Sequence, residues 1–143
     1  MTDPLQGIEH ISPNLTIASV LKFCERQNIG ITRGMIQNYI RDGVLPPPVN
    51  RRFYTHKHLA ALVLIDRLKT VFDMPTVKAA LQPYIDDEGI SLDMYTAILQ
   101  KLTGIVSAWQ VSAAPVLTAE SDGGVLLSMM FAAEIKSAIV PQA

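Results

Sequence analysis

The stretch that decides the fold spans residues 32–54 and reads TRGMIQNYIRDGVLPPPVNRRFY. Thr32 is a favourable helix N-cap, and the apolar residues after it recur at helical spacing, so we predict a helix over 32–42. Gly43 can adopt the left-handed conformation that ends a helix, and the three prolines that follow cannot continue one. The segment 46–54 then carries two adjacent arginines. The stretch therefore predicts a capped helix followed directly by a short basic segment.

Helical patterns also dominate the rest of the chain. Five further segments show apolar residues at helical spacing, near 17–27, 55–71, 77–84, 91–111 and 125–140. Thr16, Thr55 and Ser91 precede three of these segments and are suitable N-caps. Before the segment 77–84, the residues Asp73, Met74 and Pro75 predict a turn. We predict an all-α fold, with at most a tiny β element in the segment 46–54.

The charge is distributed unevenly along the chain, although the formal net charge is only −1. Between Leu15 and Tyr84, ten lysines and arginines stand against four acids, a local net charge of +6, whereas the rest of the chain carries −7. Such asymmetry indicates that one part of the chain binds a polyanion such as nucleic acid. A solvated charged surface is the alternative explanation.

The predicted helix 32–42 has the polar face that DNA recognition requires. Its apolar stripe can dock on other helices, while Arg33, Gln37, Asn38 and Arg41 occupy the opposite face. In helix-turn-helix proteins the second helix lies in the major groove. Gln and Asn can pair with adenine there, and Arg with guanine. The alternative is an ordinary amphipathic helix with a polar outer face.

The order of these features resembles the DNA-binding head of MerR-type transcription regulators. The resemblance rests on Tyr39 near the helix end, on the run 43–46 (Gly-Val-Leu-Pro), and on Arg52 and Tyr54 at the end of a basic wing, 46–54. A long leucine-rich helix and a second short helix then follow, as in that family. The family's wing residues contact DNA phosphates, so the resemblance implies that role for Arg52 and Tyr54. The candidate DNA-binding residues are Arg33, Gln37, Asn38, Tyr39, Arg41, Arg51, Arg52, Tyr54 and Lys57.

Two departures from the MerR pattern are visible. The run 37–39 (Gln-Asn-Tyr) stands where that family often has Arg-Tyr-Tyr. Asn50 and Arg51 stand where a glycine normally precedes the wing's aromatic and arginine residues. The whole chain also resembles a family of small bacterial proteins called domain of unknown function 1836. That second resemblance implies a MerR-like head with a helical tail and supplies no ligand.

The chain divides by pattern into three parts. Residues 1–14 are predicted to be a flexible lead-in, and residues 15–85 to be the winged helix-turn-helix head. The acidic run 86–89 reads as a linker, and residues 90–143 as a helical tail. The tail is too apolar to remain as isolated solvent-exposed helices, so we expect it to form a homodimer. Two heads would then address two half-sites of double-stranded DNA.

Several protein classes do not fit the sequence. Cys24 is the only cysteine, which excludes a disulfide framework and a multi-thiolate metal site, and we expect its thiol to be buried. No stretch reaches the roughly 18 uninterrupted apolar residues that span a bilayer, and residues 1–6 lack the features of a signal peptide. We find no catalytic triad, paired carboxylates or phosphate loop at telling spacing. His56 and His58 are expected to be exposed at a helix start.

These observations lead to one prediction of function and two alternatives. The prediction is a cytoplasmic, homodimeric, sequence-specific DNA-binding transcription regulator that is not an enzyme and uses no metal or cofactor. It would read DNA with the helix 32–42 and the wing 46–54. The first alternative is a winged-helix module that binds protein instead of DNA. The second is a sensor whose tail binds a small molecule, of unknown identity.

Overall fold

The computed structural model describes residues 5, 8–12, 14–111 and 124–139, with side chains omitted at 9, 105–111, 124–125 and 134–139. Within these ranges the chain is helical, and only isolated β-bridges occur. The all-α prediction is therefore confirmed for the described residues. The helices are α1 (Ile17–Arg26), α2 (Arg33–Arg41), α3 (His56–Lys69), α4 (Met74–Leu81), α5 (Leu92–Val111) and α6 (Gly124–Ile139), with short 3-10 helices η1 (Ile8–His10) and η2 (Gln82–Tyr84).

Threonine caps fix where the first helices begin. Thr16, Thr32 and Thr55 each accept a hydrogen bond at 3.2 Å from a backbone N–H in the first turn of the helix that follows. These N-caps are the predicted ones, because a hydroxyl satisfies an N–H group that has no partner within its helix. The start of α4 lies within the predicted turn 73–75. Asp73 accepts from the N–H of Thr76 at 2.9 Å, so the helix begins at Met74.

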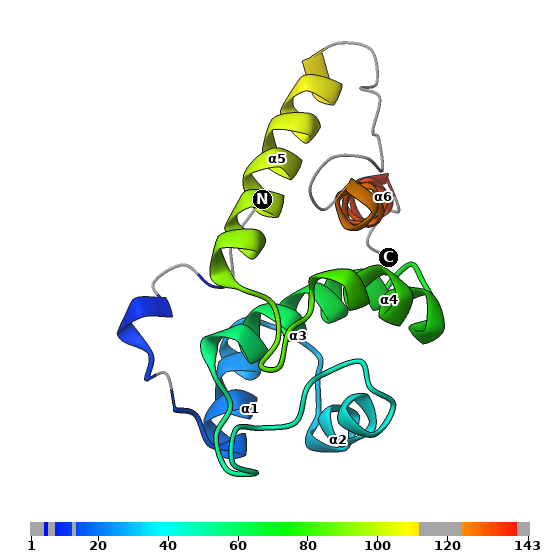
Figure 1. Ribbon diagram of the computed structural model, residues 1–143. Helices are drawn as coiled ribbons and strands as arrows, with labels where there is room; N and C mark the ends of the chain where they lie inside the picture. The colour runs from blue at the N-terminus through cyan, green and yellow to red at the C-terminus, as the bar shows by residue number, and fades with distance from the viewer. Residues whose placement is uncertain (1–4, 6–7, 13, 112–123, 140–143) are drawn as a thin grey trace.

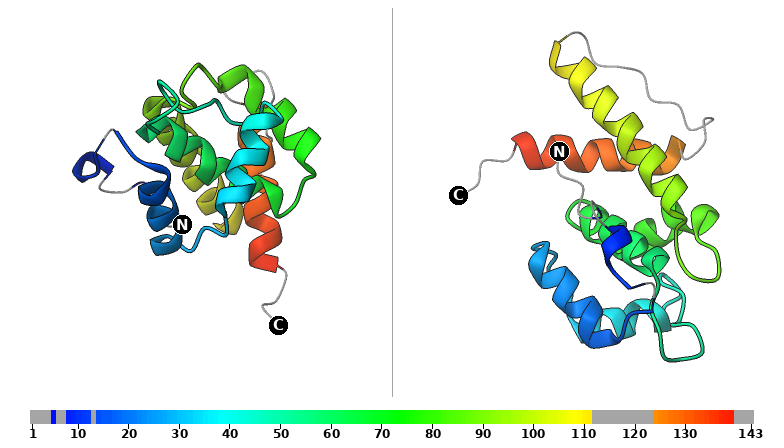
Figure 2. Two further views of the ribbon diagram at one scale, coloured as in Figure 1. Left: turned by 90° about the horizontal axis from the view of Figure 1, so that it is seen from below. Right: turned by 90° about the vertical axis from the view of Figure 1, so that its left-hand side faces the viewer.

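Helix α3 forms the centre of the molecule. Figure 1 and the right-hand view of Figure 2 show α1 and α2 below it and α5 and α6 above it. Every residue from His58 to Ile65 is buried, and so is Leu68. A helix covered on all sides must be apolar all round, which explains the unbroken run of apolar residues in this segment.

The tail does not stand apart from the head. Helices α5 and α6 pack against each other and against α3, and α6 also contacts α4. Tyr95, Ile98 and Leu102 of α5 belong to the same buried core as the residues of α3. The upper side of α3 requires an apolar cover, and the tail supplies it within the same chain. The tail residues 112–123 and 140–143 lie outside the described residues.

The segments expected to be a linker and a flexible lead-in both pack against the head. In the run 86–89, Asp86 pairs with Lys57 on α3, and the next residue, Ile90, donates its N–H to the Lys57 carbonyl at 3.2 Å. In the lead-in, Leu5 is only 4% exposed and η1 forms a short turn. The Ile11 carbonyl oxygen lies 2.8 Å from the His56 ring. The local sequence does not predict the packing of either segment, because the contacting residues are distant in the chain.

Gly89 holds the loop 86–90 against α3. It has a φ of +135°, and a Cβ atom added there would lie 2.5 Å from the Lys57 carbonyl carbon and closer still to the oxygen. Backbone atoms cannot move aside as a flexible side chain can. The loop can therefore dock on α3 only with glycine at this position.

We expect Gly89→Ala to lower the free energy of unfolding by about 3 kcal/mol or more, because the new methyl group overlaps the α3 backbone. Gly104→Ala is the matched control. Gly104 lies inside α5, where an added Cβ atom meets nothing within 4 Å. This substitution should therefore raise the free energy of unfolding by about 0.5–1 kcal/mol. Urea denaturation measures both. Equal stabilities of the two variants would contradict the docking role of Gly89.

Candidate nucleic-acid interface

Helix α2 presents a polar face to solvent, as its pattern predicts. Ile36 and Tyr39 are buried, at 0% and 6% exposure, and they dock the helix on the core. Gly43 has a φ of +76° and ends the helix. The N–H groups of the two residues after it both donate to the Tyr39 carbonyl, at 2.8 and 3.1 Å. The exposed residues of the opposite face include Arg33, Gln37, Asn38 and Arg41.

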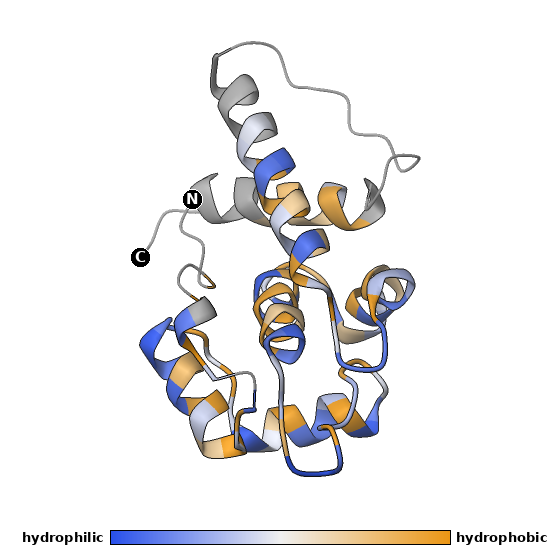
Figure 3. Cartoon of the chain, turned by 60° about the vertical axis from the view of Figure 1, so that its left-hand side comes forward, coloured by the Kyte–Doolittle hydropathy of each residue, from blue (hydrophilic) through white to orange (hydrophobic). Residues whose placement is uncertain are grey.

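The wing is a tight hairpin with two arginines at its tip. Val49 and Phe53 exchange backbone hydrogen bonds at 2.7 and 3.1 Å. Between them, Asn50 and Arg51 have φ values of +53° and +59°, as in a type I′ turn. Figure 3 shows this hydrophilic loop at the lower edge of the molecule, beside α2. Asparagine tolerates a positive φ, but arginine adopts it only at an energetic cost.

The wing is anchored at its base. Leu15 and Tyr54 exchange backbone hydrogen bonds, both 2.8 Å long, which tie the end of the wing to the residue before the cap of α1. His58 anchors the wing from the other side. Its Nδ1 lies 3.0 Å from the backbone N of Thr55, and its Nε2 lies 3.0 Å from the carbonyl oxygen of Pro47.

His58 was expected to be exposed, and this prediction is wrong. Its side chain has 0% exposure because the Pro46–Pro48 segment folds over the first turn of α3. Burial lowers the pKa of the ring below its ordinary value, since a charged imidazolium is poorly solvated there. His56, two residues earlier on α3, is only half-buried.

A basic hollow of about 210 Å³ lies between α2 and the wing. Arg33 comes from the first turn of α2, and Arg51 and Arg52 come from the wing tip, so three arginines line one concave surface. Burial raises the pKa of Tyr54, and the charge of Arg33 opposes that rise. None of the lining residues is acidic. They are Ile17, Arg33, Gln37, Pro48, Arg51, Arg52 and Tyr54.

The chemistry of the basic hollow suits a phosphate group. Guanidinium groups form paired, charge-assisted hydrogen bonds with phosphate oxygens. Gln37 lies in the same hollow, and Asn38 is exposed next to it on α2. Amide side chains at this position can hydrogen-bond to base edges while the arginines hold the backbone. The arrangement thus places the amide side chains of Gln37 and Asn38 beside a positively charged hollow.

Four candidate residues stand outside the basic hollow, and one of them is Asn38, which is exposed on α2. Tyr39 faces the core, where burial raises its pKa, and serves the packing of α2. Lys57 is half-buried and forms an ion pair with Asp86. Arg41, at the other end of α2, has a side chain that is 71% exposed and lies 3.4 Å from the carboxylate of Asp42. The position of Tyr39 agrees with the apolar stripe predicted for the helix 32–42, whereas the pairing of Lys57 with Asp86 has no signal in the local sequence.

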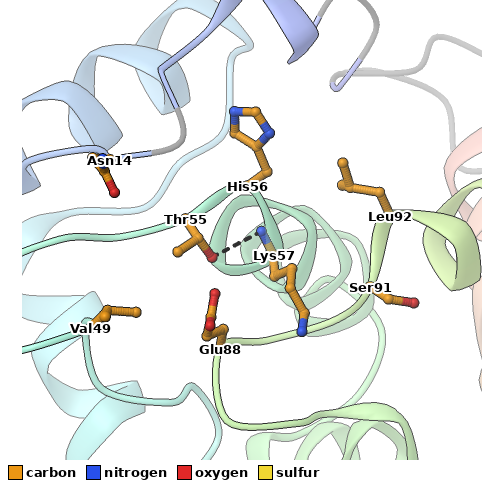
Figure 4. A pocket seen from close by; sticks show the side chains of 8 residues that line it. All are labelled: Asn14, Val49, Thr55, His56, Lys57, Glu88, Ser91 and Leu92. Carbon is orange, nitrogen blue, oxygen red and sulfur yellow. Dashed lines mark hydrogen bonds between the residues drawn. The ribbon is translucent and has the colours of Figure 1, made fainter.

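A second cavity, of about 520 Å³, opens beside the first turn of α3. Figure 4 shows that it gathers residues from the lead-in, the wing, α3, the loop 86–90 and the start of α5. The carboxylate of Glu88 points towards the first turn of α3 (Figure 4). The lining residues are Asn14, Val49, Thr55, His56, Lys57, Glu88, Ser91 and Leu92.

The part of the chain that the structure describes has no cluster of metal ligands, and its one thiol is buried. No group of three or more His, Cys, Asp or Glu residues is arranged to hold a metal ion there. Cys24 is buried as predicted, and burial raises the pKa of its thiol to about 11. No described helix is both long enough and apolar enough to cross a membrane.

The comparisons with known proteins identify a family. A family model described as "Domain of unknown function (DUF1836)" matches residues 14–98, which is more than half of the chain. The match begins just before the cap of α1 and ends within α5. It thus includes the basic hollow, the second cavity and the docked loop 86–90. No curated protein and no solved structure matches the chain.

The strained backbone at Arg51 gives a test of the wing geometry. We expect Arg51→Gly to raise the free energy of unfolding by about 0.5–1 kcal/mol, because glycine adopts a positive φ without a Cβ clash. Arg52→Gly removes the same charge at a residue without positive φ, so it should lower the free energy by about 0.5–1 kcal/mol. Urea denaturation compares the two. A loss of stability in Arg51→Gly would show that the turn is not strained.

Proposed function

The chain belongs to the DUF1836 family, whose description states no function, and we propose that it is a sequence-specific DNA-binding transcription regulator. The observation that carries this proposal is the basic hollow, where Arg33 of α2 meets Arg51 and Arg52 of the wing. In the proposed complex α2 enters the major groove, and the basic hollow holds a phosphate of the flanking backbone. The position of α2 beside the hairpin supports this proposal, because a recognition helix in the major groove would bring an adjacent wing close to the DNA backbone.

In this proposal, different side chains supply the affinity for DNA and the recognition of its sequence. Arg33, Arg51 and Arg52 supply affinity that does not depend on sequence, because every nucleotide carries the same phosphate. Gln37 and Asn38 supply the reading, because their amides pair with the donor and acceptor pattern of adenine in the major groove. The local charge of +6 over residues 15–84 adds long-range attraction to DNA.

We also propose that the protein acts as a homodimer. The support is the symmetry of typical helix-turn-helix operators, whose two half-sites need two heads. The apolar tail gives weaker support than its sequence suggests, because α5 and α6 already cover α3 within one chain. Sedimentation equilibrium with and without duplex tests the dimer. A monomer that stays monomeric on a palindromic duplex would overturn it.

A small-molecule sensor is the second candidate function. The second cavity favours it, because its volume falls within the range of about 300–1,000 Å³ typical of ligand pockets. Val49 of the wing and Leu92 of α5 both line this cavity, so a ligand there would touch head and tail together. This function is compatible with DNA binding and would regulate it.

The salt dependence of DNA binding tests the main proposal. Fluorescence anisotropy with a labelled duplex should show micromolar or tighter binding at about 50 mM salt, weakening as salt rises. Arg52→Ala should lower the slope of log K against log salt by about 1, because one phosphate contact is lost. Arg26→Ala is the matched control. It removes an exposed charge at the far end of α1 from Ile17 and should leave the slope nearly unchanged.

Two outcomes would contradict the proposal. If the wild-type protein shows no salt-sensitive binding at micromolar concentration, the head does not bind DNA and the protein-interaction alternative is favoured, since even non-specific binders show this effect. If Arg52→Ala and Arg26→Ala lower the slope equally, the charge of the head matters but the basic hollow is not the contact site.

A further inference from the structure

Both legs of the wing meet at one side chain. The outgoing leg contains Pro47, whose carbonyl oxygen lies 3.0 Å from Nε2 of His58. The returning leg ends at Thr55, whose backbone N–H points at Nδ1 of the same ring, with the nitrogens 3.0 Å apart. Apart from the tyrosines and Cys24, His58 is the only buried polar or charged side chain among the described residues.

The partners of the ring dictate its protonation state. A peptide N–H can only donate and a carbonyl oxygen can only accept. Nδ1 must therefore accept from Thr55, and Nε2 must carry the proton that is donated to Pro47. The ring of Tyr54 closes the site, with its centroid 5.2 Å from that of His58 and an interplanar angle of 80°. The wing anchor thus requires neutral His58 in one tautomer.

The two anchored residues lead directly to the basic hollow. Pro48 follows Pro47 and lines the hollow, and Tyr54 precedes Thr55 and lines it too. The proline run makes the outgoing leg stiff, because each ring fixes its own φ angle. A shift of either leg at His58 is therefore transmitted to Arg51 and Arg52 at the tip.

We propose that His58 is the positioning residue of the wing, and that protonation of its ring releases the returning leg and misaligns the wing arginines with α2. The added proton would sit on Nδ1, which could then no longer accept from the Thr55 N–H and could only donate to the Thr55 hydroxyl oxygen, 3.1 Å away. The consequence for DNA rests on the proposed function. The consequence for the wing itself does not.

The charges around His58 set the direction of the pH dependence. Burial is the main influence and disfavours the imidazolium, while Glu88 and Asp86 of the docked loop favour it. Lys57, on the same helix, pairs with Asp86 and partly offsets it. Because burial lowers the pKa of folded His58, the anchor is complete above about pH 6.5, the ordinary value for histidine, and is lost only as the pH falls through the lower pKa of the folded ring.

The first measurement is made on the full chain without DNA. Amide NMR signals of the wing (Val49, Arg51, Arg52 and Phe53) and the ring signals of His58 are followed from about pH 7.5 down to about pH 4, so that the lowered pKa of the ring lies within the range. We expect the wing signals to move with the same midpoint as the His58 ring. Wing signals that stay fixed while His58 titrates would overturn the proposal, whether or not the protein binds DNA.

Variants separate His58 from the other histidines. In His58→Gln the side-chain amide can still donate to Pro47 but does not titrate, so the wing signals should become independent of pH. His58→Asn, which can accept from Thr55, replaces it if the glutamine variant does not fold. His56→Gln, two residues earlier on the same helix, is the matched control. Its wing signals should keep the pH dependence of the wild type. A wild-type titration in the folded His58 variant would overturn the proposal.

The second measurement is duplex binding at constant salt. Protonation adds positive charge, which by itself would strengthen binding to DNA. We expect the opposite for the wild type, an affinity roughly threefold or more lower below the midpoint of the His58 titration than at about pH 7.5, and little loss in His58→Gln at the same two pH values. Stronger binding by the wild type in acid would overturn the role of His58 at the interface. Coupled NMR shifts without any DNA binding would instead refute the proposed function and leave the wing anchor standing.

Discussion

The burial of α3 on every side is the constraint on which the rest of the structure depends. A helix that is apolar all round cannot be stable with one face in water, because each large apolar side chain left exposed forfeits about 1.5–3 kcal/mol. The covers come from both directions in sequence: α1 and α2 on one side, and α5 and α6 on the other. The fold is therefore one continuous core that includes residues from Leu5 to Phe131, and the tail shares it with the head.

The same constraint places the candidate interface. The first turn of α3 is where the wing returns and where the loop 86–90 docks, and both are held by neighbouring residues of that turn. His58 binds the wing legs, and the backbone of Lys57 receives Ile90. The core thus fixes the wing relative to α2, so that the three arginines line the same basic hollow. A site built on loops gains precision when a buried helix holds those loops.

The wing also shows where local preference gives way. Arg51 occupies a backbone conformation that favours glycine, and His58 occupies a fully buried position that favours an apolar residue. Strained or buried polar residues persist where the surrounding structure over-determines them, and they cluster at functional sites. Both residues lie in the same 8-residue stretch, at the tip and at the base of one hairpin. This coincidence is the structural reason for attributing function to the wing.

By itself the sequence determined the helices, their threonine caps, the Gly43 stop and the polar face of α2, because these depend on neighbours within one or two turns. It also identified Arg33, Gln37, Arg51, Arg52 and Tyr54, which the tertiary structure gathers in the basic hollow. Only the tertiary structure decided that His58 faces inward, that Lys57 pairs with Asp86, and that the tail covers α3. The physical reason is range. Burial and loop docking depend on residues tens of positions apart, whose meeting is set by how the helices share one core and not by any local pattern.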